Sequence, residues 1–169
     1  MTSVHLKTIT QTKSITYVTT EILRSFQSLV VGLGLSPDYL MVRHYEALNQ
    51  GISIWLSEET LESVHLEIWD SSHPENLIAR VDLSFFYYHE EPEDSFYSDM
   101  DSIKNITKKI SGVKSNHEYR VMVETKDGAA SVPGWSSGSF KSTNGLKHHT
   151  IGSSVDSPHI RGSLSVWNK

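Results

Sequence analysis

The sequence contains no cysteine among its 169 residues. This absence excludes disulfide bonds, thiolate metal ligands and a cysteine nucleophile together, and it is typical of proteins of the reducing cytoplasm. No apolar run approaches the roughly 18 residues of a membrane-spanning helix. The first residues, MTSVHLKTIT, lack the apolar core and the small-residue cleavage site of a signal peptide. The sequence therefore predicts a cytoplasmic protein.

Positive charge is also scarce. The formal net charge is -5, and the longest run of basic residues is the pair Lys108 and Lys109. A general nucleic-acid binder needs a basic face to neutralise phosphates, so direct nucleic-acid binding is not expected. Hydrophobic residues make up 37% of the chain and charged residues 21%, which excludes global disorder. A chain of this length suits one domain with a substantial core.

Two helices are predicted before the first strand. The first follows a polar, threonine-rich stretch, residues 1–13, and runs from an N-cap at Ser14 to Gly32, with apolar residues at steps of three and four. The second helix follows Ser36. Its apolar stripe comprises Met41, Tyr45, Leu48, Ile52 and Trp55. Gly51, inside this second helix, either lets another backbone come close or is a tolerated weak point that costs about 1 kcal/mol relative to alanine, and we favour the second interpretation.

A change to alternating polarity predicts a sheet. Val64, Leu66 and Ile68 alternate with other residues, and a second alternating run covers residues 77–88, so the two runs form a long hairpin. The remaining predicted elements are a third helix from about Ser98 to Gly112, a strand over residues 119–123 and a final strand over residues 160–167. Two helices, a hairpin, a helix, a strand and a strand-forming tail make an α+β domain.

The nine histidines invite a metal site, but their pattern does not support one. His148 and His149 form the tightest pair, and neighbouring residues of a strand point to opposite faces, so their rings are not expected to converge. The acidic cluster over residues 90–94 lacks the alternating ligands and central glycine of an EF-hand. No spacing selects a Ser-His-Asp triad. We therefore predict no metal, no cofactor and no enzyme activity.

The most informative segment is Pro133–Ser154, PGWSSGSFKSTNGLKHHTIGSS. Its glycines and serines give backbone freedom, while Trp135 and Phe140 each supply about 1.5–3 kcal/mol of docking energy if fully buried. The strand Tyr119–Glu124 offers an edge to which a peptide strand can add. One interpretation is a binding module whose C-terminal segment folds over its ligand. The other is an ordinary decorated loop with both aromatic side chains in the core.

Three stretches resemble the bacterial HORMA-domain family that is associated with cyclic-oligonucleotide antiphage systems. They are SITYVTTEILRSF (Ser14–Phe26), WLSEETLESVHLEIWD (Trp55–Asp70) and the tail VPGWSSGSFKSTNGL with the later IGSSV. The resemblance covers nearly the whole chain and keeps the order of elements. It implies a HORMA-like α+β fold, with three main helices packed on an antiparallel sheet. It also implies a single domain over residues 14–169, divided into a core (14–128) and a C-terminal safety belt (129–169).

The resemblance implies partners as well. A HORMA domain wraps a short closure-motif peptide with its safety belt, and the closed protein binds and activates a cGAS/DncV-like nucleotidyltransferase. The expected peptide contacts are Tyr119, Val121, Val123, Trp135 and Phe140. Residues 1–13 match in position a flexible N-terminal arm that an AAA+ ATPase remodeller grips to open the closed state. The apolar residues of this arm are Val4, Leu6 and Ile9.

Two other functions stand beside this peptide-binding switch. A structural adaptor would have a fixed tail that resists protease whether or not a ligand is present. A small metal-dependent hydrolase would need His148, His149 or His159 to converge on a carboxylate. The non-catalytic switch is the leading hypothesis, because the resemblance to the HORMA family implies it and assigns roles to the polar arm and to the C-terminal segment.

Overall fold

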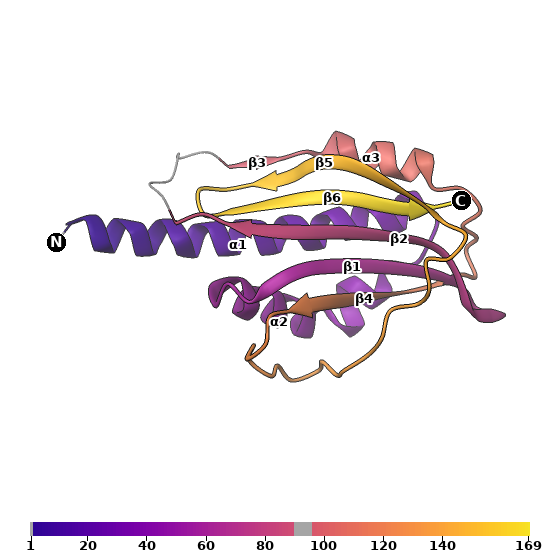
Figure 1. Ribbon diagram of the computed structural model, residues 1–169, viewed down its shortest axis with the longest axis horizontal. Coiled ribbons are helices and arrows are strands. Elements are labelled where there is room, and N and C mark those ends of the chain that lie inside the picture. The colour runs from indigo at the N-terminus through magenta and orange to yellow at the C-terminus, as the bar shows by residue number, and fades with distance from the viewer. Residues whose placement is uncertain (1, 90–95) are drawn as a thin grey trace.

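The computed structural model describes residues 2–89 and 96–169, with side chains from residue 11 onward except at Met100. In chain order the elements are α1 (Thr2–Gly32), the π-helix η1 (Tyr39–Arg43), α2 (Tyr45–Ser57), β1 (Leu61–Asp70), β2 (His73–Tyr87), β3 (Tyr97–Ser98), α3 (Met100–Lys109), β4 (Glu118–Thr125), β5 (Lys147–Asp156) and β6 (Ile160–Asn168). Three main helices therefore accompany a six-stranded sheet (Figure 1), and the predicted α+β fold class is confirmed.

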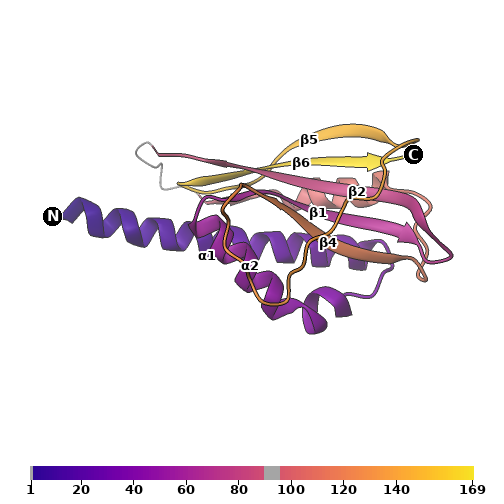
Figure 2. The same cartoon turned by 60° about the horizontal axis from the view of Figure 1, so that its bottom comes forward.

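All neighbouring strands of the sheet are antiparallel, in the order β3-β5-β6-β2-β1-β4. The predicted hairpin is confirmed as β1 and β2. In this register Leu66 lies opposite Val81 of β2 and Val121 of β4. These side chains share one face, because directly opposed residues of paired strands point to the same side of the sheet. Helices α1 and α2 cover that face and form the buried core with it (Figure 2).

Helix α1 begins at Thr2, so the helix start predicted at Ser14 is wrong. Ser14 is fully buried, and its Oγ has no hydrogen-bond partner in the described part of the chain. Threonine is a weak helix former, but such propensity is a weak prior, and here the threonine-rich stretch continues the helix. The first turns extend beyond the end of the sheet (Figure 1). No described helix has the length and apolar character needed to cross a membrane.

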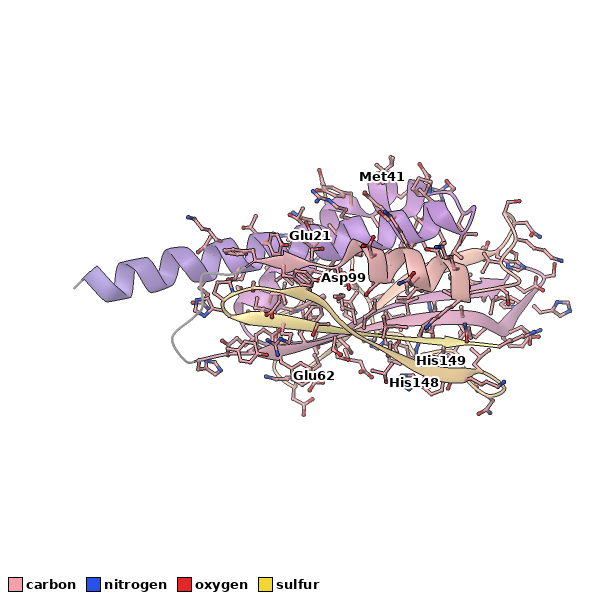
Figure 3. The ribbon with its side chains drawn as sticks, turned by 90° about the horizontal axis from the view of Figure 1, so that it is seen from above. Glu21, Met41, Glu62, Asp99, His148 and His149 are labelled. Atoms are coloured by element: carbon pink, nitrogen blue, oxygen red, sulfur yellow. The ribbon has the colours of Figure 1, made fainter. Side chains whose placement is uncertain are left out.

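The second predicted helix is divided into η1 and α2. His44 separates them, with backbone angles of φ -122° and ψ 5° that are not helical. The break changes the helical phase between η1 and α2, so Met41 is 50% exposed rather than part of the apolar stripe (Figure 3). Tyr45, the first residue of α2, is 43% exposed. The rest of the stripe, Leu48, Ile52 and Trp55, is buried as predicted.

The third helix and the last strand were also predicted. Helix α3 begins at Met100 because Asp99 caps it, accepting the backbone N–H of Ser102 at 3.0 Å. Strand β6 pairs with β2. Strand β5 was not predicted: its first four residues are exposed and polar, so the alternating pattern of a half-buried strand is missing.

A long connection links β4, at one edge of the sheet, to β5 near the other edge. We call residues 126–146 the crossing segment. It leaves the C-terminal end of β4, runs past the free edge of that strand and then crosses to β5 (Figure 1; Figure 2). The predicted safety belt thus consists of most of this segment and the β5–β6 hairpin.

Candidate functional site

Strand β4 is an edge strand, and β1 is its only neighbour in the described sheet. The N–H and C=O groups on its outer side lack a sheet partner, which is the arrangement that accepts an added strand. Two cavities of about 290 and 370 Å³ lie along this edge. Val121 and Met122 of β4 and Trp135 to Gly138 of the crossing segment line both of them. We treat the two cavities as one channel between β4 and the crossing segment.

Trp135 fixes the first part of the crossing segment to α2. Its indole Nε1 donates to the carbonyl of Ala47 at 2.8 Å, and its ring meets that of Trp55 edge to face with centroids 5.0 Å apart. The indole of Trp55 donates in turn to the carbonyl of Ala130 at 2.8 Å. Two tryptophans therefore attach the segment to the helix from both sides, each with its N–H satisfied.

Gly51 provides the space for this first anchor. A Cβ at Gly51 would lie 2.4 Å from Nε1 of Trp135, far inside van der Waals contact. On the segment's side, Gly134 has φ 88°, and a Cβ there would lie 2.8 Å from that of Ala47. The interpretation of Gly51 as a tolerated weak point is therefore wrong: the missing side chain lets another segment approach the helix backbone.

A buried carboxylate holds the second part of the crossing segment on the outer face of the sheet, opposite the helices. Glu67 of β1 is 0% exposed. One of its oxygens accepts Nε of Arg120 at 2.7 Å, and the other accepts the backbone N–H of Lys141 at 2.8 Å. Arg120 also donates to the carbonyl of Ser139 at 2.6 Å. A buried carboxylate is stable only when it is paired and hydrogen-bonded. The crossing segment covers the Glu67 carboxylate and, through the Lys141 N–H, also supplies one of its hydrogen-bond donors.

Phe140 lies on the same outer face, above a row of hydrogen-bonded polar side chains. Its ring meets that of His65 edge to face at 4.7 Å, and the guanidinium of Arg80 lies 5.1 Å from its centroid. Nδ1 of His65 hydrogen-bonds Asp82 at 2.6 Å, and Nε2 hydrogen-bonds Ser63 at 2.7 Å. Burial raises the pKa of Asp82, but hydrogen bonds from His65 and Arg80 outweigh burial and hold that pKa below its ordinary value.

Ser63, His65 and Asp82 have the mutual contacts of a catalytic triad, which no sequence spacing predicted. The Ser63 hydroxyl is buried and donates to the carboxylate of Glu124 at 3.0 Å. A negative charge beside the hydroxyl opposes the oxyanion that acyl transfer builds. Phe140 also covers the row. We conclude that these hydrogen-bonded side chains have a structural role. They form the surface on which the second anchor of the crossing segment, Phe140 with Lys141, packs.

The predicted peptide contacts lie in three different places. Val121, Val123 and Trp135 line the channel. Tyr119 is on the same face of β4 as the two valines but outside the two cavities. Its hydroxyl donates to a backbone carbonyl at 2.6 Å, and burial raises its pKa to about 12. Phe140 lies on the outer face, as an anchor of the segment rather than a wall of the channel. The five residues are therefore not one continuous surface.

The arm residues Val4, Leu6 and Ile9 lie on the first turns of α1, and their side chains are outside the described part of the structure. Their role stays a prediction. Sequence reasoning also missed Glu67 and Arg120. Both occupy positions of alternating strands that normally face water, and both bind the crossing segment, which is distant in sequence, so no local signal marks them.

The histidines do not gather at one place. His148 and His149 are neighbours at the start of β5 (Figure 3), and the His148 ring lies against that of Trp167 at 4.6 Å. His159 lies in the turn at the other end of the β5–β6 hairpin. Among the described residues, no three His, Asp or Glu side chains are grouped to hold a metal ion. The acidic cluster at residues 90–94 lies outside the described residues.

Comparison with known proteins agrees with this architecture. The chain matches the family "Bacterial HORMA domain 2" over residues 1–169. No curated protein sequence matched it. A chain of a mitotic checkpoint complex crystal structure has a similar fold, with a TM-score of 0.74, 12% identity, and coverage of 93% of this chain and 99% of that one.

Two further solved structures are similar. C. elegans HTP-1 bound to the HIM-3 closure motif has a TM-score of 0.63 and 12% identity, covering 89% of this chain and 87% of that one. A chain of the E. coli MS115-1 HORMA:CdnC:Trip13 complex has a TM-score of 0.61 and 9% identity, covering 94% and 89%. At these identities the similarity between the structures establishes the fold alone. Together with the family match over the full chain, the shared fold confirms the resemblance seen in the sequence. The protein belongs to the bacterial HORMA domain 2 family, a family of non-enzymatic adaptor proteins.

Proposed function

We propose that the protein is a peptide-binding switch. Its safety belt, residues 129–169, wraps a closure-motif peptide that adds as a strand to the free edge of β4 inside the channel. The observation that carries this proposal is the channel itself, an unpaired strand edge with a tethered segment running beside it. Main-chain hydrogen bonds to β4 supply affinity, and the side chains of the channel supply specificity.

The two anchors of the crossing segment make release of such a peptide slow. The segment is held on α2 by Trp135 and on the outer face by Phe140 and Lys141. A peptide enclosed between β4 and the segment leaves only after one anchor detaches. Its dissociation rate therefore follows the opening of the belt, and a switch requires that the open and closed packings be close in free energy.

We further propose that the closed protein acts in the cytoplasm, in antiphage defence, as the activator of a cGAS/DncV-like nucleotidyltransferase. In this scheme an AAA+ ATPase grips residues 1–13 and disassembles the complex. Similarity in fold to a HORMA protein solved with CdnC and Trip13, and to HTP-1 solved with a closure motif, supports these partners. The first turns of α1, which extend beyond the sheet, provide an accessible handle.

A peptide-display selection on the full chain tests the peptide-binding function. One short motif should be enriched, and a synthetic peptide of that sequence should dissociate faster from Trp135→Ala and Phe140→Ala than from the wild type. Phe86→Ala, at a phenylalanine that is 56% exposed on β2, is the matched control and should dissociate like the wild type.

Absence of any enriched motif would reject the peptide-binding function. If a motif were enriched but both anchor variants released it at the wild-type rate, the tail would be fixed structure. The structural adaptor would then be the better description of the protein. Circular dichroism of each variant establishes that the fold is intact.

A further inference from the structure

The side chains of the channel restrict the chemistry of the peptide, an inference that rests on the proposed function. Among the described residues that line the two cavities, no carboxylate is present, and the only basic side chains are Arg120 and His44, both at the smaller cavity. The guanidinium of Arg120 is already engaged by the Glu67 carboxylate and the Ser139 carbonyl. The larger cavity has no Arg, Lys, His, Asp or Glu in its described lining and therefore offers no charged side chain to a ligand.

A charged peptide residue inside the channel would be poorly compensated. Lysine or arginine would lose water and find no carboxylate. Aspartate or glutamate would find no cation in the larger cavity, and in the smaller one Arg120 is already balanced by Glu67 at 2.7 Å. Burial of a charge without a partner is strongly unfavourable. The part of the peptide that lies in the larger cavity, beside Val121, Met122 and Val123, is therefore uncharged.

The helix-facing side of the channel is apolar. Val121 and Val123 are two residues apart on β4 and point to the same side as the buried residues of β1. Trp55, Val132 and Trp135 add apolar surface around the larger cavity, whose lining also includes the hydroxyl side chains of Thr125 and Ser131. Because side chains of an added strand alternate as well, peptide residues two apart face these valines and tryptophans.

The other side of the channel is narrower. Met122 points to the outer face, and a Cβ at Gly138 would lie 3.4 Å from the methyl group of Met122. The crossing segment thus lies close to β4 at this point. Two peptide residues face Val121 and Val123. The peptide residue between them points to this narrower side, toward Met122 and Gly138.

From these two sides we infer the central pattern of the ligand: an aliphatic residue, a small uncharged residue and a second aliphatic residue, in extended conformation. The aliphatic side chains face Val121, Val123 and the tryptophan pair. The small residue faces Met122 and Gly138.

The test is the display selection read position by position, on the wild type, Met122→Glu and Met41→Glu. Met122 lines both cavities, whereas Met41 is a half-exposed methionine of η1 that lines neither and serves as the matched control. The wild type and Met41→Glu should enrich the aliphatic–small–aliphatic pattern. Met122→Glu should lose that motif at least about tenfold and enrich peptides with lysine or arginine at the middle position.

Selection of a motif with a charged residue at any of the three positions would overturn the inference and leave the peptide-binding function intact. So would enrichment of an unchanged motif by Met122→Glu. A charge scan keeps the test valid if Met122→Glu does not fold: each central residue of the selected peptide is replaced by aspartate and by lysine. Each replacement should weaken binding to the wild-type protein at least about tenfold by fluorescence anisotropy. Absence of any motif would reject the proposed function, and the inference with it.

Discussion

The indole of Trp135 occupies the space that a side chain at Gly51 would need. A Cβ at Gly51 would lie 2.4 Å from Nε1 and 2.9 Å from Cε2 of that ring. Helix α2 therefore contains its least favourable helix former where the crossing segment docks. Local helix stability and attachment of the belt make opposite demands on this one position, and the two demands can be separated by mutation.

Gly51→Ala should weaken the first anchor even though alanine favours a helix by about 1 kcal/mol. In the wild type the added methyl group displaces Trp135, so a bound peptide should dissociate faster. In a Trp135→Ala background the clash with the indole is gone, and Cζ3 of Trp55, 3.0 Å from the new Cβ, can shift into the vacated space. There the same substitution should stabilise the protein by up to about 1 kcal/mol. Urea unfolding of the four proteins of this cycle measures the coupling. Equal effects of Gly51→Ala in both backgrounds would show that the two residues do not interact.

Glu67→Gln should loosen the second anchor. The amide keeps the size of the side chain but leaves Arg120 without its ionic partner and weakens the bond to the Lys141 N–H. We expect a loss of about 1.5–3 kcal/mol in the free energy of unfolding. Hydrogen exchange at the Lys141 amide should be faster than in the wild type. Glu62→Gln, at an exposed position of the same strand, is the control and should change neither quantity. Unaltered exchange at Lys141 would contradict the assignment of Glu67 as the anchor's acceptor.

A disulfide between positions 47 and 134 should lock the belt. The Cβ of Ala47 and a Cβ built at Gly134 are 2.8 Å apart. A disulfide needs about 3.8 Å between these atoms, so the segment must shift by about 1 Å. The natural chain has no cysteine, so the double variant Ala47→Cys/Gly134→Cys has one possible intramolecular pair. Oxidation after loading should slow peptide release, and oxidation before loading should slow uptake, because only the second anchor can then detach. Peptide exchange at the same rate before and after reduction would argue against belt opening.

The stabilisation provided by the polar side chains beneath Phe140 should be lost at acid pH. The pKa of Asp82 is below its ordinary value of 3.8, because hydrogen bonds from His65 and Arg80 outweigh the opposing effect of burial. A carboxylate with a lowered folded-state pKa stabilises the protein above the unfolded-state value, and this contribution is lost as the pH falls through the lowered pKa. Asp82→Asn should therefore cost about 1.5–3 kcal/mol near neutral pH. The difference from the wild type should shrink below pH 4 or so. Urea unfolding at a series of pH values from neutral to about pH 3 measures the difference in unfolding free energy between the variant and the wild type. A difference that stays constant with pH would exclude Asp82 as the source of the acid sensitivity.

Deletion of residues 1–13 should leave peptide binding unchanged and abolish disassembly by the ATPase. The deletion removes the turns of α1 that extend beyond the sheet, while Phe26 and Leu29 stay in the core. A full-length variant with serine at Val4, Leu6 and Ile9 tests whether the apolar side chains of the arm are needed. Release of the peptide by the ATPase at the normal rate from the truncated protein would refute the role of the arm.

Sequence patterns predicted the elements whose two faces differ. The β1–β2 hairpin and β6 alternate, because one face lies against the helices, and that asymmetry is visible without a structure. Strand β5 has no such asymmetry: Lys147 to Thr150 are exposed, and its pairing with β6 depends on a hairpin rather than on a buried face. The predicted helix start at Ser14 failed because helix propensity alone did not decide how far α1 extends.

The candidate site was predicted only where residue type itself carried the signal. Trp135 and Phe140 are large aromatic residues in a segment rich in glycine and serine. Val121 lies on a strand that its alternating pattern predicts. Gly51 and Glu67 acquire their roles from the crossing segment, which is distant in sequence. In the sequence, a glycine in a helix is explained as a tolerated weak point and a glutamate on an alternating strand as a solvent-facing residue. The roles of Gly51 and Glu67 become visible only when the path of the crossing segment in the folded protein is known.

That path has a further consequence. Strand β6 pairs with β2 from Trp167 opposite Arg80 to Ile160 opposite Tyr87, so the C-terminal hairpin stays on the sheet through its own ladder. A single proteolytic cut within the crossing segment would leave every one of these strand pairings in place. It would also open the covalent loop that runs around the channel. A ligand held by contacts alone would remain bound to the nicked protein, and a ligand held by enclosure would escape, so in the proposed switch an unbroken backbone would contribute to retention as well as affinity.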